Sequence, residues 1–239
     1  MVSEPILDAI HFFQIIDFVR QKSFDTWLCF LPLLHALMVF NNKYKTLLLT
    51  IEWVMWEHLG GSKDPKDWKA NMNQVCSFST VEDFWRYFNF LPKPSEVFFD
   101  GESRKKIGPS QKVVEGYSLF KKGIEPEWGD PQNKCGGEFF CRQTMDVDAL
   151  NMYWQNLVLA VVGETMESPN TDLSNSIING ARVVDKGKQY PVFKLELWIS
   201  VKDQDVRDRL RDRLMSLITD GCPTPKKGQL RFDWKNHDD

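Results

Sequence analysis

The segment Val192–Ile199 combines residue types that are well suited to ligand chemistry. In an extended strand its apolar side chains alternate with polar ones, so Lys194 and Trp198 project from the same open face. Lys186 and Lys188 come shortly before this segment and can reach the same rim. An exposed aromatic ring can stack on a nucleobase while lysines beside it contact phosphate oxygens. The pattern therefore indicates a nucleotide-binding surface.

Two further tryptophans fall in expected loops. Trp68 follows Pro65-Lys66-Asp67, and Trp128 follows Ile124-Glu125-Pro126-Glu127. For either residue alone, folding back over the sheet edge explains the pattern equally well, because tryptophan is often only partly buried. Both together, with Trp198 and the lysines, favour a ligand site with several aromatic walls.

These residues must be positioned by a sheet with a few helices. Periodicity predicts strands over Thr46–Leu59, Tyr117–Lys121, Glu138–Thr144, Ser176–Asp185, Pro191–Ser200 and Gln229–Lys235. It predicts helices over Glu4–Gln21, Val81–Phe88, Asp146 to about Glu164, and Asp203–Asp220, the second opened by a capping box at Ser79–Glu82. Strands outnumber helices and no βαβ rhythm recurs. The expected class is α+β, a mostly antiparallel sheet with helices packed on one face.

Composition limits the partners. The chain is 42% hydrophobic and 26% charged, as globular proteins are, and its net charge of −3 lacks the basic excess needed to hold long nucleic acid. A nucleic-acid function must therefore be local to one pocket. The five cysteines form no CxxC pair and the four histidines pair with none of them at zinc spacing. We expect reduced thiols, no metal, no cofactor, and a cytoplasmic or also nuclear location.

The N-terminal region is apolar but does not have the pattern of a membrane segment. Trp27–Phe40 is apolar apart from His35, yet it is too short to span a bilayer and contains Pro32. No basic stretch precedes it, which argues against a signal peptide. We expect an N-terminal helical extension over residues 1–42 that docks on the domain or a partner, and a binding domain over residues 43–239. The alternative is that Met38 is the natural start.

Several motifs resemble the eukaryotic translation initiation factor 4E family. The stretch Tyr117–Trp128 followed by Asn133–Gly137 resembles that family's cap-binding loop. The other matches, in the family's order, are Pro65–Trp68 with its first stacking loop, Ser79–Trp85 with its dorsal helix, Trp154–Glu164 with its long central helix, and Asn179–Trp198 with its phosphate-binding strands. The resemblance implies a curved sheet with helices on the convex face and a pocket for the 7-methylguanosine cap of mRNA on the concave side.

The resemblance also implies roles for individual residues. Trp68 and Trp128 would sandwich the guanine base, whose N7 methylation adds a cation–π contribution of about 1–2 kcal/mol. Trp198 would line the methyl group. The triphosphate would be held by Lys186, Lys188 and Lys194. His237 falls where the family has a histidine near the second nucleotide, although a lone C-terminal histidine is more often solvated.

Two features depart from the family pattern. Gly129 stands where the family has a glutamate that accepts hydrogen bonds from guanine N1 and N2. The absence of this glutamate costs about 2 kcal/mol of charge-assisted binding. Asp130 and Glu138 are the candidates to replace it, and Glu138 stands where the family usually has an arginine. The loop at Gln189–Pro191 is also longer. We expect weaker or altered cap affinity.

The same resemblance predicts a second surface. Val81 and Trp85 lie four apart on one helical face, which suits either core packing or partner binding. In the family this helix receives an amphipathic peptide from a 4G-type scaffold or a 4E-binding protein. Leu48 lies in Leu47-Leu48-Leu49, which replaces the family's His-Pro-Leu motif.

An enzyme is disfavoured, since the sequence contains no Gly-x-Gly-x-x-Gly, complete P-loop or Gly-x-Ser-x-Gly motif. Cap binding in translation initiation, together with a scaffold protein, is the favoured function. The alternative is an adaptor or repressor with weak cap affinity that works through the dorsal helix. General binding of single-stranded RNA is disfavoured by the slightly acidic balance.

Overall fold

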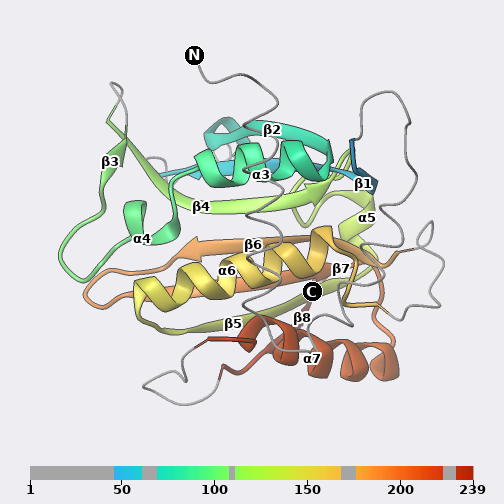
Figure 1. Cartoon of the computed structure of the whole chain (residues 1–239). Helices are drawn as coiled ribbons and strands as arrows, with labels where there is room; N and C mark the ends of the chain where they lie inside the picture. The colour runs from blue at the N-terminus through green and yellow to red at the C-terminus, as the bar shows by residue number, and fades with distance from the viewer. Residues whose placement is uncertain (1–45, 61–68, 108–110, 168–175, 223–229, 239) are drawn as a thin grey trace.

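The fold is built on an antiparallel sheet. The computed structural model describes residues 46–60, 69–107, 111–167, 176–222 and 230–238. Its main strands are β1 (Leu48–Leu59), β2 (Met72–Thr80), β4 (Lys112–Lys121), β5 (Gly137–Thr144), β6 (Ile178–Asp185), β7 (Val192–Ile199) and β8 (Asp233–Asn236). They run in the order β2-β1-β4-β6-β7-β5-β8, and the short β3 (Lys106–Ile107) pairs with β4. Every pairing among these strands is antiparallel, as Figure 1 lets the reader follow.

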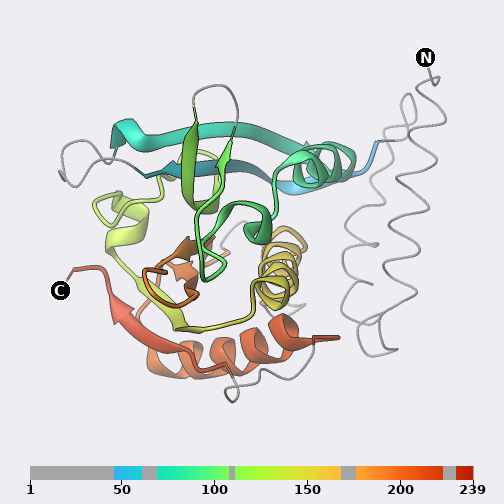
Figure 2. The same cartoon turned by 90° about the vertical axis from the view of Figure 1, so that its left-hand side faces the viewer.

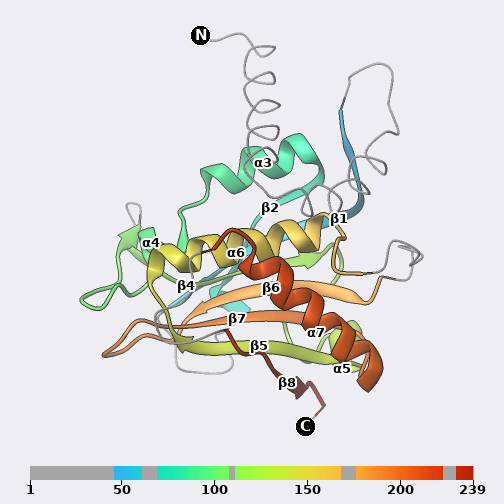
Figure 3. The same ribbon diagram turned by 60° about the horizontal axis from the view of Figure 1, so that its bottom comes forward.

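Within the described residues, three longer helices pack on one face of this sheet. They are α3 (Val81–Phe90), α6 (Val147–Val162) and α7 (Gln204–Thr219); α6 and α7 lie side by side across the sheet (Figure 3). Helix α6 begins where the Asp146 carboxylate accepts the backbone N–H groups of Asp148 and Ala149. Its apolar residues then meet the sheet, so the fold class α+β is confirmed. The short elements are α4 (Pro94–Val97), α5 (Pro131–Lys134) and a 3-10 turn at Lys69–Asn71.

The two faces of the sheet are buried by different partners. On the helix side the strands contribute Trp53, Leu119, Val183 and Leu195, among others, to one large core with α6 and α7. On the opposite side Phe120, Ile124 and Trp198 form a separate small cluster. Figure 2 shows α6 and α7 on one side of the strands and α5 on the other. The period-two alternation of the strands therefore sorts core residues from site residues.

Most predicted elements are confirmed, with ends shifted by a few residues. The strand β2 was not predicted, because only Met72 and Phe78 are buried along it and the other residues give no alternation. The final strand is shorter than predicted and begins at Asp233. The predicted helix Glu4–Gln21, and the proposed extension over residues 1–42, lie outside the described residues.

The predicted capping box at the start of α3 is wrong. Thr80 is the N-cap residue, and its hydroxyl accepts the backbone N–H of Asp83 at 3.0 Å. The Glu82 carboxylate instead accepts the backbone N–H of Leu47 at 3.1 and 3.2 Å. Glu82 therefore ties the start of β1 to α3 rather than capping its own helix.

Candidate functional site

Trp198 lies on the predicted face of β7 but is not exposed. Only 1% of its surface is accessible, which corrects the expectation of an open aromatic ring. Its ring meets Phe120 edge-on at 5.3 Å between centroids and lies 4.3 Å from the His237 ring. These covering residues come from β4, which is separated from β7 by β6, and from the C-terminal segment; a strand pattern alone does not reveal either contact. Trp198 therefore forms the floor of the site.

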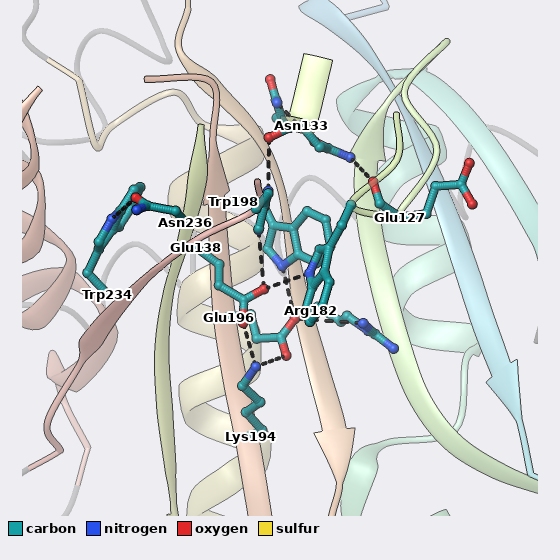
Figure 4. Close-up of polar contacts among 12 residues, drawn as sticks. Glu127, Asn133, Glu138, Arg182, Lys194, Glu196, Trp198, Trp234 and Asn236 are labelled. Atoms are coloured by element: carbon teal, nitrogen blue, oxygen red, sulfur yellow. Dashed lines mark hydrogen bonds and ion pairs between the residues drawn. The ribbon is translucent and has the colours of Figure 1, made fainter. Parts of the chain in front are cut away.

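Lys194 is already neutralised by two buried carboxylates. Its ammonium lies 2.6 Å from Glu138 Oε1 and 2.7 Å from Glu196 Oε1 (Figure 4). The Trp198 indole N–H donates to the other oxygen of Glu196 at 2.9 Å. A phosphate would have to compete with both carboxylates for Lys194, because charges paired away from water interact strongly. The predicted role of Lys194 in phosphate binding stays untested.

The less compensated cations lie one strand away, at Arg182 and Lys186. The guanidinium of Arg182 is 3.9 Å from Glu196, and its Nε is buried without a hydrogen-bond partner among the described residues. Desolvation and the nearby charge of Arg182 lower the pKa of Lys186. Burial, and then these same two cations, lower the pKa of His58, whose ring contacts the Ser118 hydroxyl. Such crowding of positive charge suits an anion.

Arg182 was not singled out from the sequence, although it faces the site. It pairs across the sheet with Glu196, so its position beside the acidic group became visible only once β6 and β7 were placed together. Lys188 lies exposed between these two strands.

Trp128 is the half-exposed aromatic ring of the site, with 44% of its surface accessible. Its indole N–H points to Glu138 Oε2 at 3.4 Å. The plane of the His237 ring makes an angle of 20° with that of Trp128, and the two ring centroids are 6.1 Å apart. The ammonium of Lys235 lies 3.8 Å from the centroid of the Trp128 ring. The ring already holds a cation against its face, which is the interaction a cationic base would make.

The loop that carries Trp128 is held by internal hydrogen bonds. The buried amide of Asn133 donates to the carbonyl oxygens of Glu125 and Glu127 at 2.8 and 2.9 Å. The two oxygens of Asp130 accept the backbone N–H groups of Gln132 at 2.8 Å and of Glu125 at 2.9 Å. Asp130 therefore shapes the loop and caps α5, and both of its oxygens are in use. A rigid loop suits a stacking residue because little order remains to be gained on binding.

Glu138 is fully buried at the centre of the site. Burial by itself would raise the pKa of its carboxyl, but hydrogen bonds and charge from His237 and Lys194 hold that pKa well below its usual range. Its partner His237 is buried, with 6% exposed, so the expectation of a solvated histidine is wrong. The His237 Nδ1 donates to the Asn133 carbonyl at 2.9 Å, and Nε2 lies 3.4 Å from Glu138.

Trp68 lies outside the described residues, but its neighbour Lys69 is described. The ammonium of Lys69 forms an ion pair with Glu125 at 2.6 Å. The chain directly after Trp68 is therefore next to the loop that carries Trp128.

A second surface surrounds α3. Trp85 is partly buried, and its ring centroid lies 4.9 Å from that of Phe84. Val81 is buried on the inner side of the helix. Leu48 is 44% exposed and Phe90 is 90% exposed. A cavity of about 450 Å³ opens between the end of α3, α4 and α6, lined by apolar and polar side chains that include Phe88, Leu91, Pro92, Met152 and Gln155.

Two absences hold for the described part of the chain. It contains no cluster of three or more His, Cys, Asp or Glu side chains that could hold a metal ion. None of its helices is long and apolar enough to cross a membrane.

Fold and site together define an α+β binding protein, with aromatic rings, a buried carboxylate and cations gathered on the sheet face opposite the helices. The chain belongs to the eukaryotic initiation factor 4E family, whose model matches residues 48–239.

Individual relatives and solved structures agree with that family. Eukaryotic translation initiation factor 4E-2 of Schizosaccharomyces pombe is 29% identical, over 73% of this chain and 63% of that relative. Eukaryotic translation initiation factor 4E1 of Drosophila melanogaster is 30% identical, over 73% of this chain and 60% of that relative. The chain thus spans less than two thirds of the length of these relatives. C. elegans eIF4E-3, solved with the 4E-binding protein Mextli and a cap analog, superposes with a TM-score of 0.57 at 28% identity, covering 79% and 92% of the two chains. Ascaris suum eIF4E-3 with m7G cap gives 0.58 at 26% identity, covering 78% and 89%.

Proposed function

We propose that this chain binds the 7-methylguanosine cap of messenger RNA and acts in translation initiation as a binding protein, not as an enzyme. The observation that carries the proposal is Trp128, a half-exposed indole on a rigid loop, placed beside the buried Glu138 and a group of cations. The family of the chain and the neighbours solved with a cap or cap analog support it.

The base stacks on Trp128 and is enclosed from the other side by Trp68. The Lys69–Glu125 ion pair supports this pairing, because it holds the residue next to Trp68 beside the loop of Trp128. Each aromatic face contributes about 1–3 kcal/mol of stacking. Methylation makes the base cationic and adds a cation–π contribution. Trp198 lies in the floor near the methyl group, and the buried His237 belongs to that floor rather than to a site for the second nucleotide.

The phosphates are held chiefly by Arg182 and Lys186, with Lys188 at the rim. These cations are favoured over Lys194, because two carboxylates already pair with Lys194, whereas the buried Nε–H of Arg182 has no partner in the described part of the chain. A phosphate oxygen would supply that missing acceptor and reduce the repulsion between Arg182 and Lys186.

The surface around α3 binds a scaffold protein of the initiation factor 4G type or a 4E-binding protein. Trp85 and the exposed Leu48 would contact the partner, and the buried Val81 would hold the helix in place. The second candidate function, an adaptor or repressor with weak cap affinity, is favoured by one specific observation: Lys194 is already paired with acids inside the site.

A titration followed by tryptophan fluorescence tests the cap proposal. We expect 7-methyl-GTP to quench saturably and GTP to bind about tenfold or more weakly, as a cation–π gain of 1–2 kcal/mol implies. Trp128→Ala should abolish the preference for the methylated nucleotide. The matched control is Trp85→Phe on the opposite face, which should keep it. Equal quenching by both nucleotides would contradict the proposal and favour the adaptor.

A further inference from the structure

Guanine presents two kinds of donor on its Watson–Crick edge, the N1–H and the N2 amino group. A protein that recognises an extracted base reads this edge with hydrogen bonds. Donors enclosed between aromatic walls need an acceptor, since an unsatisfied buried polar group costs the full desolvation penalty. A carboxylate oxygen with two free lone pairs can accept both of these adjacent N–H donors.

Most of the carboxylates around Trp128 are already committed. Both oxygens of Asp130 accept backbone N–H groups, and Glu125 pairs with Lys69. The Glu196 oxygens accept from Lys194 at 2.7 Å and from Trp198 at 2.9 Å. Figure 4 shows the Glu127 carboxylate pointing away from the Trp198 indole. The residue after Trp128 is Gly129, which has no side chain to offer.

Glu138 differs from these because only one of its oxygens is strongly held. Lys194 donates to Oε1 at 2.6 Å. Among the described residues, its Oε2 has only the Trp128 indole N–H and His237 Nε2, each at 3.4 Å, beyond the usual 2.7–3.2 Å of N–H···O hydrogen bonds. This oxygen is fully buried, lies beside the half-exposed ring, and retains the capacity to accept stronger donors.

We infer that Glu138 reads the Watson–Crick edge of guanine, with Oε2 accepting from N1–H and N2–H while Lys194 holds Oε1. The inference rests on the proposed cap-binding function and names the residue that gives it base specificity. The base donors replace the two long contacts, and the Trp128 indole N–H is released as its ring stacks on the base. Lys194 is then a positioning residue that keeps the carboxylate ionised and oriented.

The experiment compares 7-methyl-GTP with 7-methyl-ITP, which differs only by lacking the N2 amino group. We expect the wild-type protein to prefer the guanine nucleotide about tenfold, the effect of one charge-assisted hydrogen bond. In Glu138→Gln this ratio should fall to about threefold or less. The preference of 7-methyl-GTP over GTP should persist, because it depends on the aromatic rings.

Gly129→Glu provides an independent arm. A Cβ at position 129 meets nothing within 4 Å, so a side chain fits there. Added to Glu138→Gln, this change should restore the ratio to about tenfold. A thermal melt checks each variant, and if Glu138→Gln does not fold, the comparison of wild type with Gly129→Glu alone decides.

The outcomes separate the inference from the function on which it rests. A wild-type protein without preference, in which Gly129→Glu alone creates one, would overturn the role of Glu138 and leave cap binding intact. Loss of the ratio in Asp130→Asn but not in Glu138→Gln would assign the acceptor to Asp130 instead. If neither nucleotide quenches, cap binding itself fails, and the inference fails with it.

Discussion

At the scale of single residues, the site is organised by which charges are already paired. Lys194 lies between two buried carboxylates. In contrast, Arg182 has a buried Nε without a partner among the described residues, and its positive charge lies close enough to Lys186 to lower the pKa of that lysine. A cation that is paired gains little from a phosphate, because the phosphate must first displace a carboxylate. Cations without such a partner gain most, so we expect the proposed phosphate contacts at β6 and its end.

This difference predicts the effect of Lys186→Met. We expect the affinity for 7-methyl-GTP to fall about five- to tenfold through loss of one charge-assisted contact, on the order of 1–1.5 kcal/mol. The affinity for 7-methylguanosine, which lacks phosphates, should change less than about twofold. Fluorescence titration of both ligands measures the two effects.

Lys122→Met is the matched control, because Lys122 is an exposed lysine that pairs with Glu52 outside the site. It should change neither affinity. A parallel loss for the nucleoside in Lys186→Met would place Lys186 at the base instead of the phosphates.

At the scale of elements, the C-terminal end of α6 places a carboxyl group where its pKa is strongly shifted. Glu164 follows the C-cap Gly163 and has a φ of +53°, in the left-handed region where glycine is more usual. Burial, and then the neighbouring charge of Glu167, raise the pKa of its carboxyl to about 7. One of its oxygens is buried without a hydrogen-bond partner among the described residues.

The raised pKa of Glu164 predicts a pH dependence of stability. In the unfolded chain this carboxyl ionises near pH 4.5, whereas in the fold it keeps its proton up to about pH 7. The contribution of the protonated Glu164 carboxyl to the free energy of unfolding is therefore complete below about pH 4.5, and it is lost as the pH rises to about 7. We expect Glu164→Gln to flatten this decline and to raise the free energy of unfolding at pH 8 by on the order of 1 kcal/mol, after discounting for partial exposure.

Urea unfolding at several pH values between 4.5 and 8 measures the effect. Glu102→Gln removes an exposed carboxyl in the segment before β3 and should leave the curve unchanged. Identical pH profiles for the wild type and Glu164→Gln would show that this carboxyl does not control stability.

At the scale of the whole molecule, local patterns predicted the sheet well but not what covers it. Alternation along β7 correctly assigned Trp198 to the face away from the helices. It gave no sign that Phe120 and His237 bury this ring, because those contacts join distant parts of the chain. Cross-strand register likewise brings Glu138 beside Trp198 and Arg182 beside Glu196. Those pairings depend on strand order, which periodicity does not contain.

The net charge of −3 predicts how the molecule responds to RNA length. The chain as a whole has no basic excess, so nucleotides beyond the cap should find few further phosphate contacts. We expect a capped RNA of twenty nucleotides to bind within about threefold of 7-methyl-GTP. Its affinity should also fall only weakly with salt, because the salt slope grows with the number of phosphates contacted.

Competition titrations at 50 and 200 mM salt measure both quantities, since this range separates a few contacts from many. The matched control is the same RNA without a cap, which should compete poorly at either salt concentration. A capped RNA that gains affinity steadily with length, and loses it by about a thousandfold across this salt range, would indicate a long basic track. In that case the acidic balance of the chain would have concealed a general RNA-binding surface. A short reach confined to the cap would instead leave the α3 face, on the other side of the sheet, free for a protein partner while the cap is bound.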